Sequence, residues 1–375
     1  MERQKDESPE TEKHEVPFSS NEVRLSPRGW LAVACVAAAL FCGIPVAWER
    51  IEPFEPGADY RVPYRLSYDY WMIQRYCRRI ATEDKTPVLG DSAVWGHYVA
   101  KDQTLSHYLN ELGGGDRFVN LGIDGIHPAA MAGLVEHYGQ DITDSKVVVN
   151  CNLLWTASKR RDLSDQKESD FNHPKLVPQV YPTVPCYRES WSRRLGIVVG
   201  REVPFFGWVD HLRIAYFEDM DIAAWTIEHP YTNPVGAVTL DLPSPDEPPS
   251  TEPVADSWTN KGMRQVNFPW VQLDESFQWR CFQRAVGILQ RRGNTVFVLV
   301  GPFNEHMLRQ ESLETYQERK RSVEAWLEQQ GLPHFVPTAL PSEYYADASH
   351  PLADGYRLLV EQMLDNKSFR EFLAN

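Results

Sequence analysis

The sequence predicts an α/β domain built on a short-stranded parallel sheet, with helices on both faces forming a three-layer αβα sandwich. Short apolar runs alternate with stretches of helical periodicity, which is the pattern of successive βαβ units. The apolar runs are rich in β-branched residues and lack polar alternation, so both faces of each strand are expected to be buried. A hydrophobic content of 42% and an aromatic content of 12% are sufficient for such a core.

The expected elements follow the chain in alternating order. Strands are predicted at residues 87–89, 117–121, 146–150, 295–300 and 334–336. Helices are predicted at residues 70–81, 105–112, 128–138, 274–292, 311–330 and 352–364, and a further helical run directly after Ser92. Three of the predicted strands are followed by a residue that could serve a functional site: Ser92, Gly122 and Asn152. Because the carboxyl ends of parallel strands meet at one edge of a sheet, we expect these residues to share a site.

The residues before the predicted domain divide into three parts. Residues 1–28 are polar and carry charges of both signs, which predicts a disordered tail. Residues 29–48 form an uncharged run of about the 20 residues that a bilayer core requires, with tryptophans near both ends, and predict a transmembrane helix. The alternative is a buried helix of a soluble protein. Residues 49–69 are expected to be a stalk, and residues 70–375 the folded domain.

The stretch 156–269 interrupts the alternation of strands and helices. It is rich in Pro, Trp and Tyr, and we interpret it as an insertion lying over the active-site end of the sheet. Its low-complexity segment at 242–253 is expected to be an exposed loop. Its aromatic residues either stack on sugar rings or form a small core of their own; those considered are Trp155, Trp191, Trp208 and Trp225.

Charge and cysteine content exclude some functions and leave others open. The net charge of −14 argues against nucleic-acid binding, which requires clustered Lys and Arg. The six cysteines show no metal-binding spacing, and they form either disulfides or buried thiols. Four histidines (His97, His107, His127 and His137) are likewise scattered without metal spacing. No metal and no organic cofactor is expected.

Two short motifs point to nucleophilic catalysis. Gly90-Asp91-Ser92 stands where a predicted strand ends and a helix begins, a turn that exposes a serine hydroxyl beside the helix N-terminus. The alternative is that Asp91 or Ser92 merely caps the helix. Near the C-terminus Asp347 stands three residues before His350, so that the carboxylate can orient the imidazole locally. The alternative is a loop that leads into a helix, with Pro351 at the first helical position. It explains the proline but not the three-residue spacing of Asp347 and His350.

Together these motifs resemble the SGNH/GDSL hydrolase superfamily, whose members carry four short blocks in a fixed order. Gly90-Asp91-Ser92 matches the first block, Gly122 the second, and Asp347 with His350 the last. The third block is matched in part: Asn152 falls on its asparagine, whereas Asn150 replaces its glycine and Leu153 its second acid. The blocks span residues 86–364, and nothing in 156–269 resembles the common core.

The resemblance implies a role for each matched residue. Ser92 would be the nucleophile, His350 the general base and then the acid, and Asp347 the orienting carboxylate. The oxyanion hole would combine the backbone N–H groups of Ser92 and Gly122 with the side-chain amide of Asn152, for which Asn150 is the nearby alternative.

The expected function is that of a membrane-anchored serine esterase or O-acyltransferase with an acyl-serine intermediate, acting on an acyl ester or an acetylated glycan. The resemblance implies a single-pass protein with an extracytoplasmic, periplasmic catalytic domain. One alternative is a non-catalytic module with this fold in polysaccharide or envelope biogenesis. Another is a soluble intracellular lipase, if residues 29–48 do not span a membrane. The acyl group, its acceptor and the oligomeric state stay open.

Overall fold

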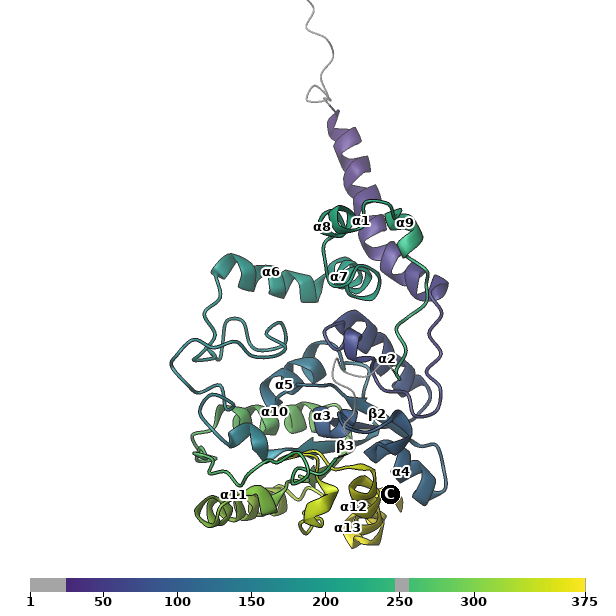
Figure 1. Ribbon diagram of the computed structural model, residues 1–375. Coiled ribbons are helices and arrows are strands. Elements are labelled where there is room, and N and C mark those ends of the chain that lie inside the picture. The colour runs from purple at the N-terminus through teal and green to yellow at the C-terminus, as the bar shows by residue number, and fades with distance from the viewer. Residues whose placement is uncertain (1–24, 247–255, 375) are drawn as a thin grey trace, which may run out of the picture.

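The computed structural model describes residues 25–246 and 256–374, and Figure 1 shows their arrangement. At the centre lies a parallel sheet with the strand order β2-β1-β3-β4-β5. Its strands are β1 (Thr86–Gly90), β2 (Phe118–Gly122), β3 (Lys146–Cys151), β4 (Thr295–Val300) and β5 (His334–Phe335). The chain passes from β1 to β2 on one side and then to β3 on the other. Such a reversal opens a crevice at the carboxyl ends of β1 and β3, where ligands bind in open parallel sheets.

Helices cover both faces of the sheet, so its central strands are buried (Figure 1). On one face α5 (Pro128–His137) packs against α10 (Phe277–Arg291). Beside α10 lies α11 (Gln310–Gln329), joined to it by Trp279 and Trp326, whose ring centroids are 5.1 Å apart. Elsewhere on the sheet, α4 (Leu105–Gly113) packs against β2 and against α12 (Ala353–Asp365), and α13 (Lys367–Ala374) packs against β4 and β5. The predicted α/β class with a parallel sheet is confirmed.

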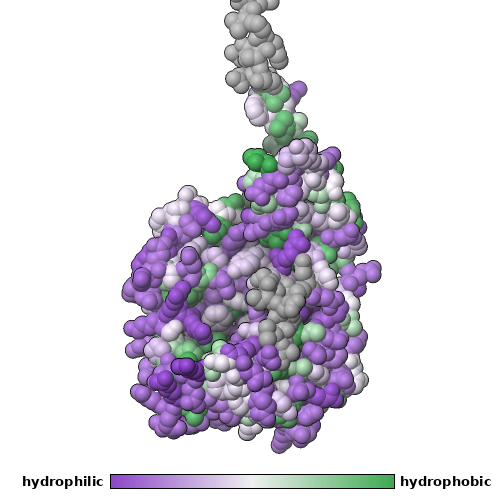
Figure 2. All heavy atoms as spheres, viewed as in Figure 1, coloured by the Kyte–Doolittle hydropathy of each residue, from purple (hydrophilic) through white to green (hydrophobic). Residues whose placement is uncertain are grey.

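The first helix, α1 (Pro27–Ile51), is 25 residues long and starts two residues before the predicted span. Within the described part of the chain it is the one helix long and apolar enough to cross a membrane. Its apolar stretch is almost wholly exposed, and Figure 2 shows hydrophobic residues along it above a body that is mostly hydrophilic on this face. The tail predicted at 1–28 lies outside the described residues except for its last four, of which Pro27 and Arg28 belong to α1.

The segment expected to be a stalk is part of the domain. It contains the short turn η2 (Tyr64–Leu66) and leads directly into α2 (Tyr70–Thr82). Val62 and Leu66 are buried in the main core, and Trp95 donates its indole N–H to the carbonyl oxygen of Val62 at 2.7 Å. Arg75 of α2 binds the carboxylate of Glu52 at the end of α1 at 2.7 Å, so α1 connects to the domain without a free spacer.

The insertion contains helices that the sequence did not predict. They are α6 (Trp191–Glu202), α7 (Pro204–Tyr216), α8 (Ile222–Glu228) and α9 (Pro234–Ala237), preceded by the turn η4 (Leu153–Thr156). The rings of Phe205 and Phe41 stack with centroids 4.2 Å apart, and those of Trp208 and Trp48 meet edge to face. We expected the insertion to lie over the carboxyl end of the sheet, but its helices gather at the base of α1 (Figure 1).

A buried ionic cluster joins α1, α2 and α7. His211 of α7 lies between Asp69 and Glu52, with its Nδ1 2.6 Å from one carboxylate and its Nε2 2.9 Å from the other. Arg75 reaches the second Glu52 oxygen at 2.7 Å, and the Tyr216 hydroxyl also donates to Glu52. Burial alone would lower the pKa of His211, but the two carboxylates raise it to about 9. His211 is therefore an imidazolium at neutral pH and completes the charge balance of the cluster.

The cysteines form no disulfide. All six are free, and all six lie within the described residues. Cys77, Cys151, Cys186 and Cys281 are buried, whereas Cys35 and Cys42 are exposed on α1. Of the two alternatives for the domain cysteines, the buried thiols are the one observed.

Candidate functional site

Ser92 stands at the carboxyl end of β1, at the first position of the four-residue helix α3 (Ser92–Trp95). The turn is tight because Gly90 has no side chain: a Cβ there would lie 2.3 Å from Val94 and 2.8 Å from Asn150. Asp91 caps the helix, accepting the backbone N–H of Ala93 at 3.0 Å. The capping interpretation is thus correct for Asp91, and it leaves the hydroxyl of Ser92 free for another partner.

That partner is His350. Its Nε2 lies 2.8 Å from the Ser92 hydroxyl oxygen, although 258 residues separate the two in the sequence. Its Nδ1 lies 2.8 Å and 2.9 Å from the two carboxylate oxygens of Asp347. Asp347 accepts only at these oxygens, so Nδ1 carries the proton and Nε2 is free to accept from the Ser92 hydroxyl.

A compact turn holds the carboxylate of Asp347 in place. One Asp347 oxygen accepts the backbone N–H groups of Ser349 and His350 at 2.9 Å and 3.0 Å. Burial would raise the pKa of Asp347, but the charge and hydrogen bonds of His350 and these N–H groups hold it well below its usual range. Conversely, burial would lower the pKa of His350, and Asp347 more than offsets this, so the pKa is raised. The structure thus places Ser92, His350 and Asp347 in the order that nucleophilic catalysis requires.

Asp91 links this group to the end of β3. Its second carboxylate oxygen accepts the side-chain amide of Asn152 at 2.8 Å and the indole N–H of Trp155 at 2.7 Å. The Asn152 oxygen accepts the backbone N–H of Leu154 at 3.0 Å. The amide has two N–H groups, and only one of them has an acceptor among the described residues. Asn152 therefore sits beside Ser92 with one N–H unused.

Asn150, the alternative to Asn152, is directed elsewhere. Its side chain is buried and its amide donates to the carbonyl oxygen of Gly301 in the chain after β4. Asn152 is the residue of this pair that contacts the Ser92 turn through Asp91.

Gly122 does not offer the N–H group expected of it. That N–H donates to the side-chain oxygen of Asn120 at 2.9 Å, and the Asn120 amide donates to the carbonyl oxygen of Val94 at 2.8 Å. A Cβ at Gly122 would lie 2.3 Å from the backbone nitrogen of Trp95. Gly122 is therefore a glycine because α3 lies directly against β2. On the same loop, Gly125 has φ +70° and a backbone N–H without an acceptor in the described chain.

Two more aromatic side chains lie beside His350, and sequence reasoning gave neither of them a role in the site. The ring centroids of His97 and Tyr98 lie 5.6 Å and 5.4 Å from that of His350. His97 is held by Asp124 of the loop after β2, at 2.6 Å. Burial and the nearby Asp347 raise the pKa of Tyr98 to about 12, so its phenol keeps its proton. His97 stands only five residues after Ser92, and that proximity was the available signal.

Of the four tryptophans considered, Trp225 alone lies in a core of the insertion's own. Trp155 belongs to the site through Asp91, whereas Trp225 is buried against Phe217 and His229 within the insertion. Trp208 packs on α1, and Trp191 is exposed. Of the loop expected at 242–253, residues 247–253 lie outside the described chain.

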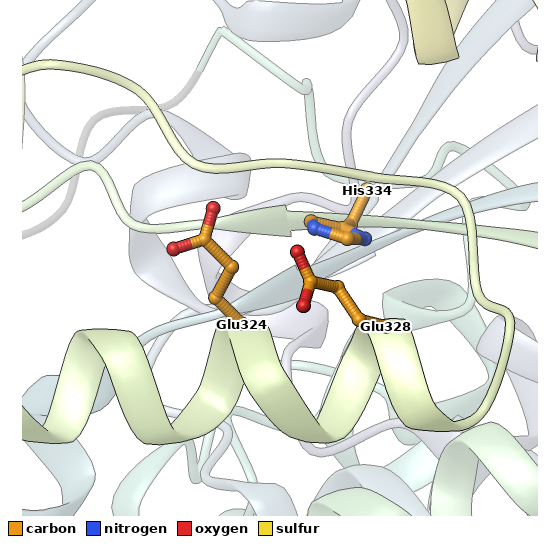
Figure 3. A group of neighbouring side chains, drawn as sticks. All are labelled: Glu324, Glu328 and His334. Carbon is orange, nitrogen blue, oxygen red and sulfur yellow. The ribbon is translucent and has the colours of Figure 1, made fainter.

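One group of side chains could hold a metal ion, at the edge of the sheet. Glu324 and Glu328 of α11 and His334 of β5 place their ligand atoms within 4.8 Å of one another (Figure 3). Glu328 is exposed, and the Nδ1 of His334 already lies 2.8 Å from the carbonyl oxygen of Leu332. The group contributes no side chain to the Ser92 site.

No protein-family model matches the sequence, and no curated protein matches it significantly.

Proposed function

We propose that the protein is a membrane-anchored serine esterase or O-acyltransferase of the SGNH type. The observation that carries this proposal is the hydrogen bond between His350 Nε2 and the Ser92 hydroxyl, with Nδ1 of the same ring held by Asp347. The position of Ser92 at the β1–β3 reversal supports it, because ligands of parallel sheets bind there.

The chemistry follows from these contacts. Ser92 Oγ attacks the carbonyl carbon of an ester while His350 Nε2 takes the hydroxyl proton, giving a tetrahedral oxyanion and an imidazolium beside Asp347. The imidazolium then donates that proton to the departing alkoxide, leaving an acyl-serine and an alcohol. Water or a second alcohol next gives its proton to His350 and attacks the acyl group. The bond between Ser92 Oγ and the acyl carbon then breaks, and the imidazolium returns its proton to Oγ. The product is a carboxylic acid in the first case and a new ester in the second.

The oxyanion needs preorganised donors, and the site offers candidates for them. We propose the backbone N–H of Ser92 and the unused N–H of Asn152. Loss of one such donor costs about 10²–10³ in kcat, and we expect this of Asn152→Ala.

The acyl group is proposed to lie on a glycan outside the cytoplasm. A helix that is long and apolar enough to span a bilayer supports the anchoring, and the exposed Trp191 offers a face on which a sugar ring could stack. The resemblance to membrane-anchored acyltransferases supports the placement of the domain in the periplasm.

The test is p-nitrophenyl acetate hydrolysis by the full-length chain in a non-ionic detergent. Ser92→Ala and His350→Ala should each lower kcat/KM by about 10⁴. The matched controls are Ser322→Ala, an exposed serine of α11, and His229→Ala in the insertion. Full activity of Ser92→Ala would show that the hydrolysis occurs elsewhere.

A non-catalytic module is the second candidate, favoured by the replacements at Asn150 and Leu153 in the third block. It predicts that a fluorophosphonate probe leaves Ser92 unlabelled in the folded protein. Labelling that disappears in Ser92→Ala and His350→Ala, but persists in both controls, would exclude it.

A further inference from the structure

A groove of about 600 Å³ lies between the insertion and the body of the domain. One wall is formed by α6 and α7, and the other by α2 with Tyr138 at the end of α5. Ligand pockets have volumes of about 300–1,000 Å³, so the groove is large enough for one extended hydrocarbon chain.

The insertion wall of this groove is apolar and unfilled. Leu195 and Val199 stand one turn apart on α6, and Phe206 and Val209 stand on α7. These four side chains are 40–56% exposed. Trp71 of α2 contributes to the opposite wall. Contiguous apolar side chains left open in a folded domain mark a binding groove, because their burial by a ligand is favourable.

A positive charge borders the apolar wall. Arg201 donates to the carbonyl oxygens of Lys175 and Val177 and lies 3.3 Å from the ring of His137. Its Nε is buried without a partner, and within the described chain no carboxylate pairs with this guanidinium. Lys175 in the same wall is already paired with Asp210. A half-buried cation without a counter-charge is costly, and an anionic ligand group would supply that charge.

The groove lies beside α1. Its wall helix α7 contacts α1 through Phe205 and Trp208, which stack on Phe41 and Trp48. In Figure 1 the helices α6 and α7 form a layer between the sheet and the free part of α1. A groove at the base of a helix that can span a bilayer is open to molecules that arrive from the bilayer surface.

We propose that this groove binds an acyl chain of an anionic membrane phospholipid, with the phosphate of its head group at Arg201 and assisted by the exposed Arg193, which also lies 3.3 Å from Glu189. The apolar wall fits the chain, the unpaired guanidinium fits the phosphate, and the position beside α1 fits the origin of the ligand. This binding does not depend on Ser92 being catalytic.

A series of contacts leads from the groove to the Ser92 site. Tyr68 lines it and stacks on His173 with ring centroids 4.4 Å apart. His173 hydrogen-bonds the carbonyl oxygen of Asp124, whose carboxylate holds His97 beside His350. An occupied groove is thus separated from His350 by a short series of side-chain contacts.

The experiment uses the full-length chain in phosphatidylcholine nanodiscs that contain a trace of phosphatidylglycerol with a photoreactive diazirine in its acyl chain. We expect peptides of α6 and α7 to be labelled after illumination. Gly200→Phe places a ring in the groove, and a Cβ at Gly200 meets no atom within 4 Å, so the variant should fold. Its labelling of α6 and α7 should fall about tenfold or more, because several methylenes lose their burial. Labelling of α1 should not change.

Gly113→Phe is the matched control, since Gly113 ends α4, lies outside the groove and also meets no atom within 4 Å. Equal labelling of the two variants, or labelling confined to α1, would overturn the proposal. Arg193→Gln combined with Arg201→Gln should abolish the preference for phosphatidylglycerol over a phosphatidylcholine probe. If the parent shows no such preference, the anionic head group is wrong. If sn-glycerol 1-phosphate competes at equal concentration, the site is one for free phosphate compounds.

Discussion

At the scale of single residues, the proposed mechanism predicts that His350 sets the pH range in which Ser92 can react. The imidazole accepts the serine proton only when it is neutral, and Asp347 raises its pKa above the ordinary value of about 6.5. The rate of ester hydrolysis should therefore rise with pH through a midpoint above about 6.5. Below that midpoint His350 is an imidazolium and cannot act as the base.

Asp347→Asn tests this assignment. The amide removes the charge that raises the His350 pKa, so the midpoint should move to lower pH. The maximal rate should also fall by about 10⁴, because the amide no longer holds the productive tautomer. The measurement is kcat/KM between pH 5 and pH 9, with Asp354→Asn in the first turn of α12 as the control. An unchanged midpoint would contradict the role given to Asp347.

At the scale of elements, the contact of α3 with β2 positions Ser92, and Gly122 makes that contact possible. Gly122→Ala should force α3 away from the sheet and destabilise the protein by about 1–3 kcal/mol, as overpacking does. Gly113→Ala meets open space at the end of a helix, and it should be neutral or stabilise by up to about 1 kcal/mol. Thermal unfolding of the full-length variants in detergent measures both, and equal shifts in Tm would contradict the packing role.

The strands and most helices could be predicted because their signal is local. Strands buried on both faces leave continuous apolar runs, and all five agree with the structure within one residue at each end. The helices α6 to α9 could not be predicted, since prolines, glycines and aromatics obscure their periodicity. The segment 49–69 was interpreted as a stalk because its contacts with the domain are not local in sequence: His211, which binds Glu52 and Asp69, lies more than 140 residues further along the chain.

The residues of the site likewise fall into those that the sequence could predict and those that it could not. Ser92, Asp347 and His350 could be identified because each lies in a short motif whose spacing reflects its own turn. Whether the Gly122 N–H is free depends on the direction of the Asn120 side chain, which accepts it. The spacing of residues in a sequence motif does not reveal that direction. The place of His97 depends on Asp124, which reaches it from the loop after another strand.

At the scale of the whole molecule, the cluster around His211 joins the first helix to the domain, and its strength should depend on pH. The pKa of His211 is about 9 in the folded protein and about 6.5 in an unfolded chain. A raised pKa contributes stability that is fully present below about pH 6.5 and is lost as the pH rises to about 9 and beyond. This loss should amount to about 3 kcal/mol at most.

His211→Gln should remove that pH dependence. At pH 6.5 it should lower the free energy of unfolding by about 3–5 kcal/mol, because Asp69 then lacks its cation and Glu52 keeps only Arg75. The difference from the parent should shrink towards pH 9, where the parent also loses the imidazolium. Urea unfolding of the full-length chain at several pH values measures this, with His229→Gln as the control. A difference that is the same at every pH would disprove the protonated state of His211.

The direct connection between α1 and the domain has a geometric consequence. A catalytic domain on a long flexible tether samples a hemisphere above the membrane and can meet substrates at many heights. Here Val62 and Leu66 are buried in the core, and the His211 cluster fixes the end of α1. If α1 crosses a bilayer, the domain keeps one orientation relative to the bilayer, and Ser92 stays at one distance from its surface. If the domain is the esterase or acyltransferase proposed above, its substrate would have to be delivered to that one height above the bilayer.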